Sequence, residues 1–147
     1  GSDVGNAFAK FLIVGIGNIA LKENIYNKFQ KKGLKPISAI SKFAKIQPGT
    51  IIGEGVSIGN NCIISSDVRI GNNTFVGTNS IIELGVNISD NCKIGSNVYI
   101  GADSQIEKNV NVGVSSTILN NCKIGKNNNL KPQSLISKNI KSKLRQL

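Results

Sequence analysis

The chain has 147 residues and a formal net charge of +10, with 18 basic residues, eight acidic residues and no histidine. This length suits one repeat domain with a small addition, and no apolar run reaches the roughly 18 residues that a membrane span needs. Residues 1–10 lack the basic and apolar segments of a signal peptide, so we expect a cytoplasmic protein.

The positive charge is concentrated at the two ends of the chain. Residues 1–45 contain eight lysines and two acidic residues, and residues 123–147 contain seven basic residues and no acidic residue. These ends suit a nucleotide phosphate, or they serve only to keep a stack of repeats soluble. No aromatic pair accompanies the lysines and no basic stripe follows the middle of the chain, so we expect no nucleic-acid binding.

The N-terminal segment predicts a strand, a helix and a second strand. Residues 11–16 are apolar and indicate a buried strand, and Gly17-Asn18 indicates a turn. Residues 21–33 predict an amphipathic helix that ends at Gly33, and residues 37–40 predict the second strand. Gly15 and Gly17 follow the first strand, but a Gly-x-Gly pair alone favours a tight turn over a phosphate site.

The predicted helix has one apolar stripe. Leu21, Ile25 and Phe29 recur at intervals of four residues, which places them on one side of a helix, with Tyr26 beside them. The charged residues of the segment lie outside this stripe; they are Lys22, Glu23, Lys28, Lys31 and Lys32.

A period of six residues dominates the rest of the sequence. Every sixth residue from Ile40 onward is a branched aliphatic, without insertion or deletion. These residues are Ile40, Ile46, Ile52, Ile58, Ile64, Ile70, Val76, Ile82, Ile88, Ile94, Ile100, Ile106, Val112, Ile118, Ile124, Leu130 and Ile136. A fixed internal period indicates a repeat architecture, and period six excludes a helix.

Each six-residue unit predicts a short strand and a tight turn. Three residues after the aliphatic, the residue type tolerates a left-handed backbone. These turn residues are Gly49, Gly55, Asn61, Asp67, Asn73, Asn79, Gly85, Asn91, Asn97, Asp103, Asn109, Ser115, Asn121 and Asn127. A small or β-branched residue stands two before the aliphatic and points the same way. Three units make one coil of eighteen residues, so the fold class is mainly β, a parallel β-helix of hexapeptide repeats.

Three cysteines occupy the small inner position of their repeats. Cys62, Cys92 and Cys122 are each thirty residues apart, which is not a whole number of coils. They therefore lie on three different faces and cannot form a disulfide or a metal site. We expect small buried side chains and no bound metal.

The hexapeptide period resembles the left-handed β-helix acyltransferases, and the left-handed sense comes from that resemblance. The order of strand, Gly-x-Gly-Asn, helix and repeats is similar to bacterial acetyltransferases that modify nucleotide-linked bacillosamine, perosamine or sialic-acid-type sugars. The resemblance covers about 130 residues but only the last β-α-β piece of that family's Rossmann-like sugar-binding domain. It divides the chain into a partial Rossmann-like segment (1–39), the β-helix (40–137) and a basic tail (138–147) that forms a short cap or a frayed end.

The resemblance implies an acetyl-CoA-dependent acetyltransferase, acting at nitrogen or oxygen of a nucleotide-linked amino sugar in bacterial surface glycan biosynthesis. It implies a homotrimer with acetyl-CoA and a nucleotide sugar as ligands. The outward residues Ile63, Ile81 and Tyr99 are eighteen residues apart and would stack as a subunit contact. The alternative is a non-catalytic homologue that acts as a trimeric binding or scaffold protein.

The resemblance also implies a catalytic histidine, which this sequence lacks. By repeat register the family's acid falls on Glu83 and its histidine on Leu84, while a second histidine falls on Lys93. A histidine base typically contributes about 10² to 10⁴-fold to the rate. Glu83 and Lys93 are the candidate substitutes, and the alternative for each is an ordinary solvated repeat residue.

For acetyl-CoA, the resemblance implies backbone contacts at the turns of the late coils. The corresponding residues are Gly95, Gly101, Ala102 and Gly113. The basic residues expected near the CoA phosphates are Lys123, Lys126 and Lys131. The alternative for all seven residues is that they are ordinary residues of the repeat with no role in binding acetyl-CoA.

Overall fold

The computed structural model describes residues 11–12 and 17–145, and it begins with one β-α-β unit. Strand β1 (Phe11–Leu12) pairs in parallel with β2 (Lys35–Pro36), and helix α2 (Ile19–Lys31) connects them. This confirms the order predicted for the N-terminal segment. The predicted strand over 37–40 is wrong in its bounds, because Ile37 and Ser38 separate β2 from β3. Residues 13–16, including Gly15, lie outside the described residues.

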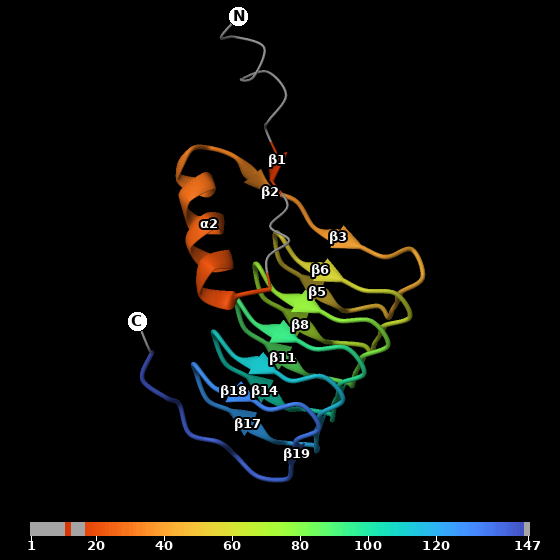
Figure 1. Ribbon diagram of the computed structural model, residues 1–147. Helices are drawn as coiled ribbons and strands as arrows, with labels where there is room; N and C mark the ends of the chain where they lie inside the picture. Colours follow the sequence, from red (N-terminus) through yellow and green to blue (C-terminus); the bar gives the residue numbers. More distant parts are fainter. Residues whose placement is uncertain (1–10, 13–16, 146–147) are drawn as a thin grey trace, which may run out of the picture.

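The remainder is a three-sided parallel solenoid built of two-residue strands (Figure 1). Face 1 consists of β3 (Ala39–Ile40), β6 (Ser57–Ile58), β9 (Phe75–Val76), β12 (Lys93–Ile94), β15 (Asn111–Val112) and β18 (Asn129–Leu130). Face 2 consists of β4 (Lys45–Ile46), β7 (Ile63–Ile64), β10 (Ile81–Ile82), β13 (Tyr99–Ile100), β16 (Thr117–Ile118) and β19 (Leu135–Ile136). Face 3 consists of β5 (Ile51–Ile52), β8 (Arg69–Ile70), β11 (Asn87–Ile88), β14 (Gln105–Ile106) and β17 (Lys123–Ile124).

The strand positions confirm the six-residue period. Each aliphatic residue of the six-residue period ends a strand. Each strand pairs with the one eighteen residues further on, as Ile63 does with Ile81 and Ile81 with Tyr99. The turns between faces form three edges, which we call edge 1–2, edge 2–3 and edge 3–1 after the faces they join. The left-handed sense of winding stays an expectation from the resemblance.

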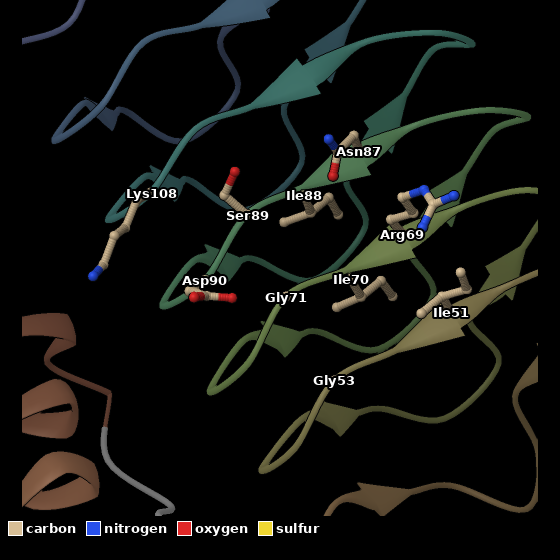
Figure 2. Close-up of a pocket in the computed structure, with 10 residues that line it drawn as sticks. All are labelled: Ile51, Gly53, Arg69, Ile70, Gly71, Asn87, Ile88, Ser89, Asp90 and Lys108. Carbon is tan, nitrogen blue, oxygen red and sulfur yellow. The ribbon is translucent and has the colours of Figure 1, made fainter.

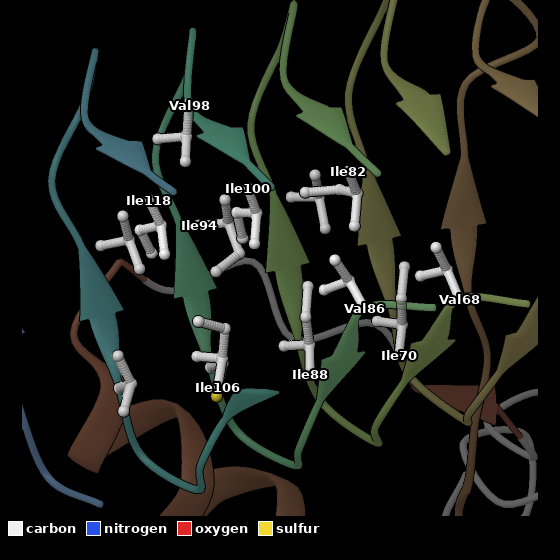
Figure 3. Packing of buried hydrophobic residues seen from close by; sticks show 14 of the residues in the cluster. Val68, Ile70, Ile82, Val86, Ile88, Ile94, Val98, Ile100, Ile106 and Ile118 are labelled. Atoms are coloured by element: carbon white, nitrogen blue, oxygen red, sulfur yellow. The ribbon is translucent and has the colours of Figure 1, made fainter. Parts of the chain in front are cut away.

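The core runs through the middle of the solenoid, where aliphatic side chains from all three faces stack in layers (Figure 3). The stacked residues from Ile58 to Ile124 are almost fully buried, and the small inner residues such as Val68 and Val98 fill the space between them. The prediction that every sixth aliphatic residue is buried is wrong for the first two, because Ile40 and Ile46 are exposed. β3 and β4 are the terminal strands of their sheets, so no further coil covers these two side chains.

The turn residues have the predicted left-handed backbone. All fourteen have a positive φ, from 56° at Asn73 to 81° at Gly49, and Gln133 joins them at 58°. On edge 3–1 the asparagines form a ladder of amide hydrogen bonds. Asn73 Nδ2 donates to Asn91 Oδ1 at 2.9 Å, Asn91 to Asn109 at 2.8 Å, and Asn109 to Asn127 at 3.1 Å. One residue type therefore supplies both the turn conformation and a bond between coils.

The cysteines lie where the period places them. Cys62, Cys92 and Cys122 are free and buried, and they precede strands of face 2, face 1 and face 3 respectively. Burial raises the pKa of the Cys92 thiol to about 12. At neutral pH this thiol is protonated and behaves as a small apolar side chain.

Helix α2 differs from its prediction in both bounds and buried face. It begins after Asn18, whose side chain accepts from Leu21 N at 3.0 Å, and it ends at Lys31 rather than Gly33. Leu21 is 49% exposed, whereas Lys22 and Glu23 are buried. The helix lies along edge 3–1, where Lys22 Nζ donates to the Asn73 carbonyl oxygen at 2.9 Å.

The basic tail adds a last partial layer to the solenoid. Ile140 forms a parallel bridge with Ile124, and Lys143 N donates to the Lys126 carbonyl oxygen at 2.8 Å. Arg145 then contacts the Glu23 carboxylate on α2. As far as Arg145 the tail is therefore an ordered cap. No helix in the described part of the chain is long and apolar enough to cross a membrane.

Candidate functional site

Edge 2–3 holds the residues that the resemblance assigns to the catalytic base. Glu83 and Leu84 directly follow β10, and Gly101 and Ala102 follow β13, which is the next strand of the same face. The Glu83 carboxylate accepts from Ser65 Oγ at 3.4 Å, and Leu84 is 50% exposed. The structure therefore brings these four residues together on neighbouring coils, and Glu83 among them is half-buried.

A second cluster lies on face 1 at edge 1–2. Lys93, Gly95, Gly113 and Lys131 line one open groove of about 340 Å³ that crosses β12, β15 and β18. Lys93 Nζ also donates to the Gly17 carbonyl oxygen at 3.4 Å, next to the start of α2. This groove is therefore a surface on which a long ligand can contact several coils and the N-terminal turn.

The two clusters do not meet within one chain. In a three-sided cross-section edge 2–3 is opposite face 1, so the hydrophobic core separates Glu83 from Lys93. The residues predicted for acetyl-CoA are divided in the same way, because Gly101 and Ala102 lie on edge 2–3 while Gly95 and Gly113 line the groove. A single site that uses both clusters needs two copies of the chain.

The predicted cofactor glycines have a structural reason within the repeat. A Cβ on Gly95 would lie 2.7 Å from Val114 N, and a Cβ on Gly101 would lie 2.6 Å from Asn120 N. The next coil approaches these positions too closely for a side chain. Both glycines are buried, and their backbone N–H groups already donate to Val112 and Ile118 of the next coil.

Two of the predicted phosphate-binding lysines lie away from the groove. Lys123 Nζ pairs with Glu107 Oε1 at 2.9 Å on face 3, and Lys126 N donates to Glu107 Oε2 at 3.0 Å on edge 3–1. The hydrogen bond from Lys123 is the main reason that the pKa of Glu107 lies below its ordinary value. Of the three lysines, only Lys131 combines exposure with a place in the groove on face 1.

Face 3 carries a second open groove of about 490 Å³, which the sequence did not indicate (Figure 2). Arg69 and Asn87 project outward from neighbouring strands, and Asp90 and Lys108 lie at the side nearest the helix. The repeat pattern places these residues outside, but it assigns no chemistry to them. In the described residues, no group of three or more histidine, cysteine, aspartate or glutamate side chains could hold a metal ion.

A smaller cavity of about 160 Å³ lies between α2 and edge 3–1. Its lining consists of Glu23, Tyr26, Asn27, Gln30, Asn72, Asn73, Asp90, Asn91 and Lys108. Glu23 Oε1 forms an ion pair with Lys108 Nζ at a distance of 3.5 Å. The sequence did not indicate this cavity, because Lys22 and Glu23 lie outside the predicted apolar stripe of the helix.

The pH dependence of stability tests whether Lys22 is buried against edge 3–1. Burial lowers its pKa to about 8 from an ordinary value of 10.5, so between these values the unfolded chain binds more protons and stability rises with pH. Relative to Lys22→Met, we expect the free energy of unfolding of the wild type to rise by about 2 kcal/mol between about pH 7.5 and pH 9.5. Urea denaturation measures this, and Lys28→Met, an exposed lysine of the same helix, is the control. Parallel pH profiles for all three proteins would contradict the buried position of Lys22.

Two hexapeptide-repeat families match the middle of the chain. The bacterial transferase hexapeptide of six repeats matches residues 49–84, and the hexapeptide repeat of succinyl-transferase matches residues 67–102. A search among curated proteins gives no match.

Several solved structures share the fold. PerB from Caulobacter crescentus, in complex with CoA and GDP-perosamine, is 18% identical with a TM-score of 0.75, and the match covers 90% of this chain and 64% of PerB. The acetyltransferase domain of PglB from Neisseria gonorrhoeae is 16% identical with a TM-score of 0.59, covering 94% of this chain and 72% of that domain. A mutant of AntD, an N-acyltransferase from Bacillus cereus in complex with dTDP and coenzyme A, is 20% identical with a TM-score of 0.65, covering 78% and 80%.

Proposed function

We propose that this hexapeptide-repeat protein is an acetyl-CoA-dependent acetyltransferase that acts on a nucleotide-linked amino sugar. The observation that supports this most is the order of its parts, a β-α-β unit followed directly by a three-sided parallel solenoid. PerB, crystallised with CoA and GDP-perosamine, matches this arrangement over 90% of the chain. We place the reaction in cytoplasmic steps of surface glycan biosynthesis.

The donor would lie in the groove on face 1. Its length across β12, β15 and β18 suits an extended pantetheine arm, which would lie over the closely packed turns at Gly95 and Gly113. Lys131 lies in the same groove and can pair with a CoA phosphate. Lys123 and Lys126 lie outside this groove, so we assign them no part in the donor site.

The site would be completed in a homotrimer. Edge 2–3 of one copy against face 1 of the next would bring Glu83 toward Lys93 across the subunit boundary. The outer column on face 2 is available for this contact, because Ile63 is 40% exposed and stacks with Ile81 and Tyr99. An apolar core surrounded by polar residues is the usual organisation of a subunit interface.

The chemistry needs one proton acceptor and precise positioning. The sugar amine attacks the thioester carbonyl, a carbon–nitrogen bond forms, the carbon–sulfur bond breaks, and CoA leaves as the thiol after taking up a proton. The Glu83 carboxylate or the uncharged form of the Lys93 amine would take the proton that the amine loses. Holding the amine and the thioester together supplies a large part of the rate acceleration even with a weak base.

Two measurements test the proposal on the intact chain. Calorimetry with acetyl-CoA should show binding, and a coupled assay for CoA release should show turnover with UDP- or GDP-linked amino sugars. The absence of both acetyl-CoA binding and turnover would rule the proposal out. Sedimentation should give three copies per particle.

A second candidate function is a non-catalytic trimer that binds the same ligands. The specific observation in its favour is the absence of histidine from the sequence. Under this candidate, acetyl-CoA binds without turnover, and Leu84→His gives turnover that the wild type lacks, because a general base typically contributes about 10² to 10⁴-fold to a rate. Lys126→His is the matched control, because Lys126 occupies the same repeat position on edge 3–1, is also exposed and lies outside the groove on face 1. Rapid turnover by the wild type would exclude this candidate.

A further inference from the structure

The end of the solenoid at β3 and β4 exposes apolar side chains. These are the terminal strands of their sheets, so no described coil lies over Ile40 and Ile46. Ile40 is 43% exposed, whereas Ile58, its counterpart in the next coil, is 3% exposed. Ile37 and Phe43, which lie on either side of β3, are exposed as well. We call Ile37, Ile40, Phe43 and Ile46 the apolar end.

The apolar end is surrounded by positive charge. Residues 24–53 contain six lysines and no acidic residue. Some of these lysines are in the last turn of α2, and Figure 1 shows that this end of the helix leads to β2, at the same end of the solenoid as β3. None of the six forms an ion pair in the described part of the chain. The exposed lysines are Lys28, Lys31, Lys32, Lys35, Lys42 and Lys45.

A second copy of the chain does not suit this surface. A head-to-head contact would bring two sets of six lysines together. A head-to-tail contact would place the lysines against the other end of the solenoid, where residues 123–147 carry seven basic residues and no acidic one. Like charges repel each other in both arrangements. The surface therefore fits a partner that is negatively charged and can also cover apolar side chains.

The surface of an anionic lipid bilayer has both properties. Its phosphate groups attract lysines, and the boundary between headgroups and acyl chains accommodates isoleucine and phenylalanine side chains. Lys42 Nζ lies 5.1 Å from the centre of the Phe43 ring, so charge and apolar surface are adjacent at this end. A nucleic acid would neutralise the lysines, but its phosphate backbone would leave the apolar side chains without a partner.

We propose that the apolar end binds the surface of an anionic membrane, with its four apolar side chains at the boundary of the acyl chains and the six lysines near lipid phosphates. The headgroup layer contains water, so the backbone groups at the open edges of β3 and β4 stay hydrated. This interaction goes beyond the proposed acyl transfer, because neither acetyl-CoA nor a sugar takes part. The candidate catalytic residues lie on the sides of the solenoid and stay accessible.

Co-sedimentation of the full chain with lipid vesicles tests the proposal. We expect binding to vesicles of equal parts phosphatidylcholine and phosphatidylglycerol, weakening as potassium chloride is added, and no binding to vesicles of phosphatidylcholine alone. Binding to neither kind of vesicle, or equal binding to both, would overturn the proposal. No readout involves acetyl-CoA, so a failure of acetyl transfer and a failure of membrane binding are distinguishable.

Two double variants with the same change in net charge locate the contact. Lys42→Glu with Lys45→Glu should lower the affinity for the anionic vesicles by at least about tenfold. Lys138→Glu with Lys141→Glu, in the C-terminal tail, should have a smaller effect, because these exposed lysines lie at the other end of the solenoid. Equal losses would mean that the net charge of the chain, rather than the apolar end, controls binding.

A variant of Phe43 distinguishes a membrane from a polyanion. Phe43→Ser should lower vesicle affinity about tenfold, because an apolar side chain no longer enters the boundary of the acyl chains. Leu21→Ser is the matched control, since Leu21 is also an exposed apolar residue but lies in the first turn of α2. If Phe43→Ser bound as the wild type does, the contact would be purely electrostatic and the assignment to a bilayer would be wrong. Circular dichroism checks that every variant is folded.

Discussion

Replacing Ile64 with alanine is expected to lower the free energy of unfolding by about 2–5 kcal/mol. Ile64 is fully buried on β7 and packs in the central stack between the aliphatic residues of the coils before and after it. Removal of three carbon atoms leaves a cavity there, and the paired coils cannot move together to fill it, because their backbone bonds fix the spacing. Urea denaturation followed by circular dichroism measures the loss.

Ile51→Ala is the matched control for this prediction. Ile51 has the same side chain on a strand of the same length, but it points outward from face 3 and is 52% exposed. We expect a loss below about 1 kcal/mol, because little apolar surface returns to water. Similar losses for the two variants would mean that the inner and outer positions of the repeat are assigned incorrectly.

Replacing Asn91 with alanine is expected to cost about 2–4 kcal/mol. The Asn91 amide accepts from Asn73 and donates to Asn109, so its removal breaks two bonds of the ladder and leaves a buried donor on Asn73 unpaired. The backbone φ of 57° adds strain once the asparagine is lost, since alanine adopts this conformation unfavourably. Thermal and urea denaturation measure the total.

Asn97→Ala is the control, because it measures the cost of the turn conformation without the loss of amide hydrogen bonds. Asn97 has nearly the same φ, 56°, but its side chain is exposed and forms no hydrogen bond in the described part of the chain. It should lose only about 1 kcal/mol. If both asparagine variants lost the same amount, the amide ladder would contribute nothing beyond the conformation of the turn.

The sequence was sufficient for the solenoid because its information is local and repeated. Every sixth residue from Ile40 ends a strand, and every predicted turn residue from Gly49 to Asn127 has a positive φ. The pattern of residue types at these positions fits few other structures, since one position must be apolar and another must tolerate a left-handed backbone. A single short apolar segment can be a helix or a strand, and the repetition of the six-residue unit decided for the strand.

The buried face of α2 could not be predicted in the same way. Its apolar stripe suggested that Leu21 packs inward, whereas Lys22, Glu23 and Tyr26 are the buried residues of the helix. Their partners Asn73 and Arg145 lie 51 and 122 residues away in sequence, and no local period reports such contacts. Polar contacts with edge 3–1 therefore outweighed the apolar stripe of the helix.

The candidate catalytic site was only partly accessible from the sequence. The repeat register could have shown that Glu83 and Gly101 share one edge and that Lys93 lies on the opposite face of the same chain. Catalysis that involves both residues depends on a neighbouring copy, whose position the repeat of one chain does not contain. The contact of the Tyr26 ring with the turn at Gly55 also needed the structure, because no local period relates the helix to that turn.

The pairing of each strand with its counterpart eighteen residues away restricts how such a protein can change in length. Deletion of one full coil would keep every remaining side chain on its own face and would only shorten the stack. Deletion of six residues would rotate everything downstream by one third of a turn, so that Asn109 and Asn127 would leave the edge under α2. Evolution or design can therefore lengthen this molecule in whole coils and still preserve the alignment of its surfaces.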